Sequence, residues 1–277
     1  MIDFNQYLRN IYGVKNGTTN SYMKAIEILD NILKQIDIRY SSGKSIVSIT
    51  DPGEIYSLYE YVKSEEKKMK KGEDSIFIHG LSNQKSYPGK GFCSAAVKSL
   101  FNYRESLIQQ EALDCLRTTK NNNQLMNNLK KITSISETEV NAEIHQRIGQ
   151  NVFREVLLEI YKCKCCVSGL NIKELLRASH ILPWAENIAN RLNPENGLCL
   201  SVLYDAAFDK YLISFDEDYK MVVSPYIKDY YTNDTVKSYF SKYEGKKLTL
   251  PEKFIPNTKF LEKHREKLIG GYNILCY

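Results

Sequence analysis

The spacing of apolar residues changes near residue 160, and this change restricts the folds open to the chain. Upstream, apolar residues recur at helical intervals over residues 20–36, 92–107 and 150–161. Downstream, the apolar runs are short and separated by polar loops, and residues 212–215 and 221–224 have the spacing of a β-hairpin. The pattern predicts an α+β protein, in which an α-rich N-terminal domain precedes a domain of shorter elements.

A polar segment marks the predicted junction between these domains. Residues 118–139 are rich in Asn, Thr, Ser and Lys and lack sustained apolar periodicity. We therefore place a helical N-terminal domain at residues 1–118, a linker at 119–139 and the second domain at 140–277. Asp51 and Pro52 are typical of a helix start, and they predict a helix over residues 55–69.

Composition excludes some classes of protein without identifying one. The 277 residues are 43% apolar and 26% charged, as in a globular protein with a substantial core, and the net charge of +5 permits a nucleic-acid partner. No stretch reaches the roughly 18 consecutive apolar residues of a membrane helix, and the first residues lack a secretory pattern. We expect a cytoplasmic protein with no membrane partner. The odd number of cysteines, seven, then favours reduced thiols.

Residues 177–209 contain the side chains with the clearest chemical potential. His180 lies in a short apolar run, Asn196 and Gly197 form a predicted turn before a second apolar run, and a helix is expected to open at Asp205. A strand, a loop, a strand and a helix in this order predict a compact ββα unit. Such a unit could bring His180, Asn196 and Asp205 to one cleft.

These side chains suit the hydrolysis of a phosphodiester, which needs a base for water and a cation to stabilise negative charge. The unperturbed pKa of histidine suits His180 to the role of base. Asp205 offers the oxygen ligand that Mg²⁺ prefers, and Asp209 follows four residues later on the same helix face. Asn196 could hold the loop and orient the imidazole. Taken singly, each residue also has a structural interpretation: a hydrogen-bonded histidine, helix caps and a turn asparagine.

Residues 137–268 contain several short motifs in a fixed order. They are Glu137-Thr138-Glu139, Arg147-Ile148-Gly149-Gln150, Phe153-Arg154, Cys166-Val167-Ser168-Gly169, Ala178-Ser179-His180-Ile181, Pro183-Trp184, Leu192-Asn193-Pro194-Glu195-Asn196-Gly197-Leu198, Phe208-Asp209, Leu250-Pro251 and His264-Arg265. In their order and spacing, these motifs resemble the HNH endonucleases of the ββα-metal class, in particular the branch found among restriction and phage-defence nucleases.

The resemblance implies that His180 is the general base, that Asn196 is the structural middle residue, and that Asp205 replaces the last histidine as metal ligand. Ser179 stands where the family often has an acidic residue or histidine that contacts the metal. The implied function is a metal-dependent DNA endonuclease that uses Mg²⁺ or another divalent cation, in restriction or phage defence. The alternatives are a DNA- or RNA-binding protein with a decayed nuclease core, and an RNA-cleaving, toxin-like nuclease.

Other residues give weaker indications of partners. Arg177, Arg191 and Lys210 flank the predicted cleft and could bind phosphate or form surface pairs. Cys163 and Cys166 form one Cys-x-x-Cys pair without a second pair, so a structural Zn²⁺ is not expected. Duplex DNA is the expected partner, with the N-terminal domain positioning DNA or a partner protein, and a homodimer could cut both strands.

Overall fold

The computed structural model describes residues 2–14, 17–36, 45–79, 85–133 and 139–270. The chain divides into unit 1, residues 1–110 with 132–148, and unit 2, residues 111–131 with 149–277. In the described residues, both β-sheets belong to unit 2, whereas unit 1 is helical. The predicted α+β class, with an α-rich N-terminal region, is confirmed.

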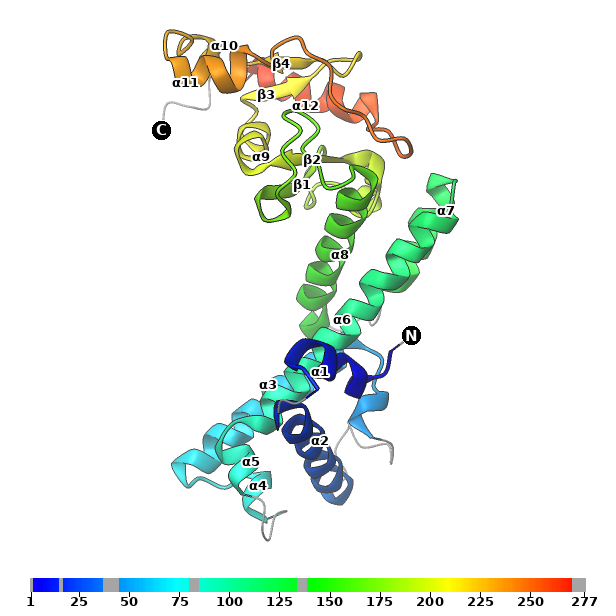
Figure 1. Ribbon diagram of the computed structural model, residues 1–277, viewed down its shortest axis with the longest axis vertical. Coiled ribbons are helices and arrows are strands. Elements are labelled where there is room, and N and C mark those ends of the chain that lie inside the picture. Colours follow the sequence, from blue (N-terminus) through cyan, green and yellow to red (C-terminus); the bar gives the residue numbers. More distant parts are fainter. Residues whose placement is uncertain (1, 15–16, 37–44, 80–84, 134–138, 271–277) are drawn as a thin grey trace. The chain divides into compact units, whose positions relative to one another are not determined.

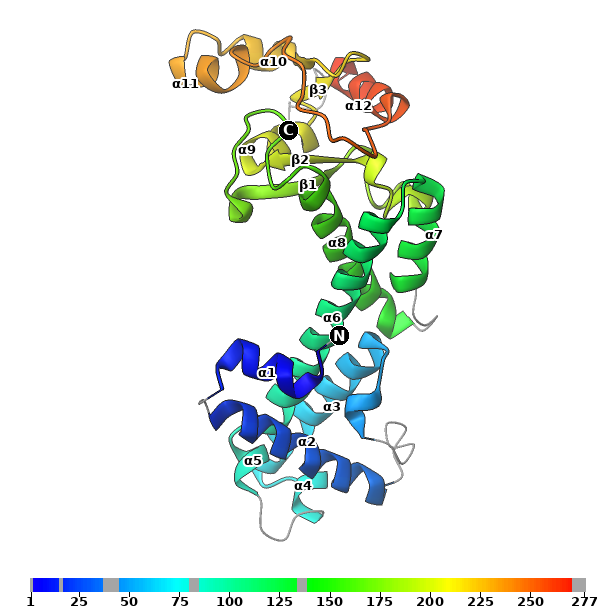
Figure 2. The same ribbon diagram turned by 45° about the vertical axis from the view of Figure 1, so that its right-hand side comes forward.

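Unit 1 is a group of helices, arranged as Figures 1 and 2 show, whose apolar residues are buried, and it includes the helices predicted by periodicity over residues 20–36 and 92–107. Its helices are α1 (Phe4–Tyr12), α2 (Gly17–Ile36), α3 (Pro52–Lys71), α4 (Ile76–His79), α5 (Ser86–Gly89) and the first parts of α6 (Phe92–Thr118) and α8 (Glu139–Ile160), with a 3₁₀ turn at Ile46–Ser48. The predicted cap of α3 is confirmed, because Asp51 accepts a 2.7 Å hydrogen bond from the Gly53 amide. At the start of α6, the buried Glu66 carboxylate accepts hydrogen bonds from the Cys93 and Ser94 amides.

The predicted linker differs from the expectation of an irregular segment. Helix α7 (Asn122–Thr133) occupies much of it, because Leu125, Met126 and Leu129 recur at helical spacing and are buried. Residues 134–138, which include Glu137 and Thr138 of the family motifs, lie outside the described residues. The domain boundaries at 118 and 140 stay a prediction.

Unit 2 contains the predicted ββα arrangement. Strand β1 (Leu176–His180) pairs antiparallel with β2 (Gly197–Ser201), with His180 opposite Gly197, and α9 (Val202–Asp209) follows. The predicted hairpin is present as β3 (Ile213–Phe215) and β4 (Met221–Val223). The remaining elements are 3₁₀ turns at Lys173–Leu175, Ile188–Asn190 and Pro194–Asn196, helices α10 (Pro225–Lys228), α11 (Asp234–Val236) and α12 (Thr258–Gly270), and a π-helical segment at Lys237–Ser241.

Two local expectations in this unit are wrong. Asn196 ends a 3₁₀ turn and Gly197 is extended, so the pair forms no tight turn. Glycine is needed at 197 because a Cβ there would lie 2.5 Å from a Leu157 methyl carbon and 2.7 Å from the Phe153 ring. The second correction concerns α9, which begins at Val202 after the N-cap Ser201, so that Asp205 lies in its first turn rather than at its cap.

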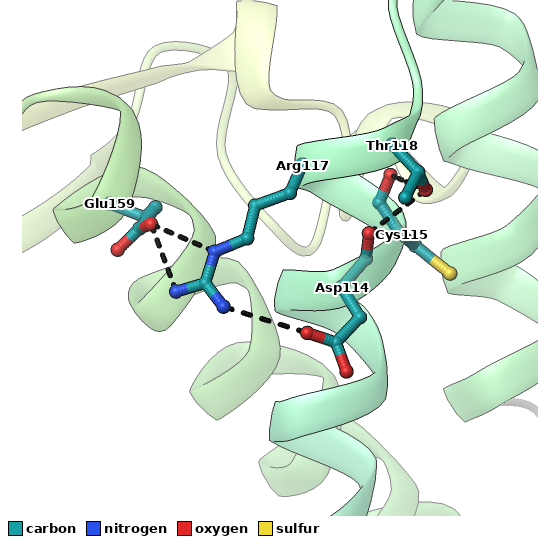
Figure 3. A network of polar contacts seen from close by, with 5 residues as sticks. All are labelled: Asp114, Cys115, Arg117, Thr118 and Glu159. Atoms are coloured by element: carbon teal, nitrogen blue, oxygen red, sulfur yellow. Dashed lines mark hydrogen bonds and ion pairs between the residues drawn. The ribbon is translucent and has the colours of Figure 1, made fainter.

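An ion pair joins α6 to α8 within unit 2. Arg117, near the end of α6, donates to Glu159 of α8 through Nε (3.3 Å) and Nη2 (3.1 Å), and also lies 3.5 Å from Asp114 (Figure 3). These groups are solvent-exposed, so each pair contributes at most about 1 kcal/mol. Within the described part of the chain, the helices are too short or too polar to cross a bilayer.

Candidate active site

A pocket of about 370 Å³ opens in unit 2 where β1 meets α9. We call it the β1–α9 pocket. It is lined by Ala178, Ser179, His180, Ile181, Pro183, Trp184, Asp205, Asp209, Tyr211 and His264. Three of the residues predicted from sequence, His180, Asp205 and Asp209, therefore line one pocket. Figure 1 shows α9 next to the β1–β2 pair, and β1 contributes Ala178, Ser179 and His180 to the lining.

The His180 imidazole is held on three sides. Its ring stacks on Phe153 with centroids 3.8 Å apart, and it lies nearly perpendicular to the Trp184 ring, with centroids 5.3 Å apart. Its Nε2 lies 2.9 Å from the carbonyl oxygen of Arg191. Because a carbonyl only accepts, Nε2 carries the proton, and a neutral ring then has an unshared electron pair on Nδ1. Burial lowers the pKa of His180 below its usual value, and the hydrogen bond to Arg191 opposes this shift.

The carboxylates of α9 are arranged by the spacing of the helix and by a serine. Asp205 and Asp209 are separated by four residues, which places both on the same helix face. The buried Ser179 donates a 2.5 Å hydrogen bond to Asp205 Oδ1. Ser179 stands where the family often has a metal-contacting residue, and here it orients the Asp205 carboxylate. Partial burial, and then the nearby Asp205 charge, raise the pKa of Asp209. A cation between the two carboxylates would relieve their repulsion.

Asn196 does not line the pocket. Its side chain is 1% exposed and holds the segment that connects β1 to β2. The Asn196 Oδ1 accepts from the Leu182 amide at 2.8 Å, and Nδ2 donates to the carbonyls of Leu182 and Asn190, each at 3.2 Å. Since Asn190 precedes Arg191, Asn196 restrains the carbonyl that contacts His180. Its influence on the imidazole passes through the backbone.

The order of these elements agrees with a comparison against protein families. Residues 165–216, which include β1, β2, α9 and β3, match the family model of the HNH endonucleases. Unit 2 contains an HNH endonuclease domain. No curated protein matches the chain. The resemblance seen in the sequence is thus confirmed for this segment, which is similar to a family of nucleases.

The donor atoms of the HNH domain fit a hydrated Mg²⁺-like ion better than a metal enclosed by protein. Among the described residues, no group of three or more His, Cys, Asp or Glu side chains is arranged to hold a metal. The β1–α9 pocket offers two carboxylates, Asp205 and Asp209. Mg²⁺ usually keeps several waters and binds proteins through one or two carboxylates, so this donor set suits it. A structural Zn²⁺ would need four ligands.

The predicted nucleic-acid contacts lie outside the lining of the β1–α9 pocket. Arg191 is half-buried, donates from Nε to the Trp184 carbonyl at 2.9 Å and lies over the Trp184 ring. Arg177 is exposed and donates to the carbonyls of Glu174 and Leu176. Lys210 is exposed just after α9. Arg191 therefore braces the loop, whereas Arg177 and Lys210 keep solvent-facing charge.

The cysteines of the HNH domain pack as apolar groups. Cys165, Cys166 and Cys199 are buried free thiols. Burial raises the pKa of Cys166 and raises that of Cys199 to about 12, so both stay protonated near neutral pH. Cys163 is partly exposed. Cys276 lies outside the described residues.

Sequence reasoning missed the far wall of the pocket. His264 of α12 is 4% exposed and stacks on Phe208 with ring centroids 3.7 Å apart. Both of its nitrogens are used, because Nε2 contacts the Phe208 carbonyl at 3.1 Å and Nδ1 contacts Ser214 Oγ at 3.0 Å. His264 is therefore a structural residue of the wall. The His264-Arg265 motif was the only sequence feature that drew attention to this residue, and it did not indicate that His264 lies in the wall of the pocket.

Proposed function

We propose that this protein is a divalent-metal-dependent DNA endonuclease that hydrolyses phosphodiester bonds and acts in restriction or phage defence. One observation carries the proposal: the imidazole of His180 and the carboxylates of Asp205 and Asp209 line the same pocket of an HNH domain. The setting in restriction or phage defence, and duplex DNA as substrate, rest on the resemblance to that branch of the family.

In this mechanism, His180 takes a proton from water at Nδ1. The lowered pKa keeps the imidazole neutral near pH 7, so its electron pair is available. When Nδ1 gains the proton, the Nε2–H bond to the Arg191 carbonyl remains in place and stabilises the cationic ring. Phe153 and Trp184 keep the ring from turning away. Asn196 contributes by restraining the loop that carries Arg191.

Asp205 and Asp209 would hold the divalent cation. When bound, a cation there supplies positive charge against the scissile phosphate and the departing oxygen. Ser179 fixes the carboxylate of Asp205 before any cation arrives, which reduces the reorganisation that binding requires. Arg177 and Lys210 would contact phosphates farther along the strand. The N-terminal domain would position DNA or a partner protein.

The test is cleavage of supercoiled plasmid with Mg²⁺, Mn²⁺ or Ni²⁺, with and without EDTA. We expect metal-dependent cleavage that His180→Gln lowers by about 10²- to 10⁴-fold, because glutamine can still donate to the Arg191 carbonyl but offers no base. Asp205→Asn should also abolish most activity. The matched control is Asp234→Asn, which changes an exposed carboxylate outside the pocket and should cleave normally.

Each alternative has its own outcome. Cleavage by His180→Gln at the parent rate would refute the mechanism. Binding of DNA without cleavage in any of the metals would support the alternative of a binding protein with a decayed nuclease core. Ser179, which stands in place of an acidic residue, is the feature that motivates this alternative. Faster cleavage of RNA than of duplex DNA would support the RNA-cleaving alternative.

A further inference from the structure

A second pocket, of about 680 Å³, lies at the opposite end of α9 from Asp209. Its lining includes Ser201, Val202 and Leu203 at the start of α9, and Tyr239 and Lys242 from the π-helical segment and the residue after it. We call it the Tyr239 pocket. All its lining residues belong to unit 2. The proposed chemistry of the β1–α9 pocket uses none of them.

Ser201 lines this pocket at the start of α9. It is 6% exposed, and as the N-cap residue of α9 its side chain makes no capping hydrogen bond. Among the described residues, no hydrogen bond to its hydroxyl is formed. The first amides of a helix also lack intrahelical acceptors and carry partial positive charge. A serine hydroxyl at the start of a helix, where it lines a pocket, is suited to an anionic oxygen.

The charge of the pocket favours the same ligand. Lys242 is its charged lining residue, and no carboxylate lines it. The neighbouring Lys228 and Lys237 are paired with Glu244 and Asp234, whereas Lys242 forms no ion pair within the described part of the chain and lies 5.3 Å from the Tyr243 ring centroid. An ammonium group held against an aromatic ring without a counter-ion is available to a phosphate.

An aromatic ring stands at the side of the pocket. Tyr239 is 49% exposed, and its backbone carbonyl is fixed by a 2.7 Å hydrogen bond from the buried Tyr204 hydroxyl. Tyr239 and Ser238 lie in the π-helical segment Lys237–Ser241, a conformation that is often found at functional sites. An exposed ring on a fixed backbone can stack on a nucleobase.

We propose that the Tyr239 pocket binds one nucleotide of the substrate strand away from the cleaved bond, with its phosphate at Ser201, the first amides of α9 and Lys242, and its base against Tyr239. This inference rests on the proposed nucleic-acid substrate. Ser201 and Asp205 are four residues apart, or about 6 Å along the helix axis, which is roughly the rise of two nucleotides in one strand of B-DNA. Helix α9 would thus contact one strand at two points.

The experiment measures binding of the full chain to labelled duplex and single-stranded oligonucleotides in EDTA, so that no cleavage occurs. Ser201→Asp introduces a carboxylate into the pocket while keeping a preferred N-cap residue, so the fold should be retained. We expect this variant to bind at least tenfold more weakly, with a thermal midpoint no lower than that of the parent.

Two further variants test the remaining parts of the subsite. Lys242→Ala should weaken binding and reduce the slope of log affinity against log salt by about 0.9 for duplex DNA, as expected for one lost phosphate contact. Tyr239→Ala should weaken binding about tenfold with an unchanged salt slope. Lys237→Ala is the matched control, because this lysine is paired with Asp234 and lies outside the pocket lining. It should bind within twofold of the parent.

Affinities and salt slopes of Ser201→Asp and Lys242→Ala that equal those of the parent would overturn the subsite. Failure of the parent to bind any oligonucleotide would overturn it together with the proposed substrate. If the variants show the expected binding pattern but none of the tested metals supports cleavage by the parent, the subsite is supported and only the endonuclease proposal is refuted. Binding and cleavage assays together therefore distinguish failure of the subsite from failure of the proposed function.

Discussion

At the residue scale, the candidate site depends on hydrogen bonds that orient groups before they act. The Arg191 carbonyl fixes which nitrogen of His180 carries the proton, and the Ser179 hydroxyl fixes Asp205. In both cases the orienting group comes from a different segment of the chain than the group it orients. Loss of such a hydrogen-bond partner should weaken cation binding or cleavage even though the imidazole or carboxylate itself remains.

Ser179→Ala should weaken cation binding by about tenfold, because the Asp205 carboxylate loses its restraint. Cleavage at saturating cation should stay near the parent rate, since both carboxylates and His180 remain. Titration of Mg²⁺ or Mn²⁺ in the cleavage assay measures the effect. Ser179→Thr, which keeps the hydroxyl, should restore affinity; equal affinities for the parent and the alanine variant would contradict the assigned role.

The buried His264 predicts a pH dependence of stability. Burial lowers the folded-state pKa of His264 to about 4 from its usual value of 6.5. Between these values the unfolded chain binds the proton and the folded chain does not, so the free energy of unfolding falls as pH drops from about 6.5 to 4. The free energy of unfolding should decrease by about 3 kcal/mol over this pH range, because each unit of pKa difference corresponds to about 1.4 kcal/mol.

Denaturant unfolding at several pH values checks this dependence. His264→Gln, which removes the titrating ring, should flatten the slope between pH 6.5 and 4. Ser214→Ala, which removes a hydrogen-bond partner of His264 but no titrating group, should lower stability at every pH while the slope persists. An unchanged slope in His264→Gln would show that other groups cause it.

At the element scale, the close packing of β2 on α8 sets the position of the imidazole. Gly197 lets the strand approach Phe153 and Leu157, and Phe153 stacks on His180. The end of β1 and the start of β2 are thereby held against one helix. Asn196, directly before β2, restrains the connecting segment from within.

Gly197→Ala should therefore destabilise the protein by about 1–3 kcal/mol, because its Cβ would overlap the Phe153 and Leu157 side chains. Displacement of Phe153 should also lower the cleavage rate measured under conditions where the variant is folded. Thermal unfolding and plasmid cleavage provide the two measurements. Gly17→Ala, where a Cβ meets open space, is the matched control, and equal losses in the two variants would contradict the packing argument.

At the scale of the whole molecule, the chain has two units, and helices α6 and α8 contribute residues to both. The residues that line the β1–α9 pocket all belong to unit 2. One such pocket can act on one phosphodiester bond at a time. Cleavage of both strands of a duplex therefore requires two chains or two successive events.

This consideration predicts the products of plasmid cleavage. At low protein concentration, nicked circles should accumulate before linear DNA, and linear DNA should form with a steeper dependence on concentration. Gel analysis of a time course at several concentrations measures both. Direct formation of linear DNA with first-order dependence on protein would contradict action by single chains and indicate a preformed dimer.

The sequence by itself determined the helices over residues 20–36, 55–69, 92–107 and 150–161, the β3–β4 hairpin and the order of the chemical groups, because periodicity and composition act over a few residues. It placed His180, Asp205 and Asp209 on elements that the structure brings to one pocket. It missed the start of α9, helix α7 and the true reason for Gly197.

Only the tertiary structure decided which distant groups meet. The Ser179–Asp205 bond, the Arg191 carbonyl at His180 and the wall formed by His264 join positions whose separation along the chain carries no periodic signal. The physical reason is that local patterns record which face of one element is buried, whereas a hydrogen bond between elements depends on how side chains from several of them fill the same space.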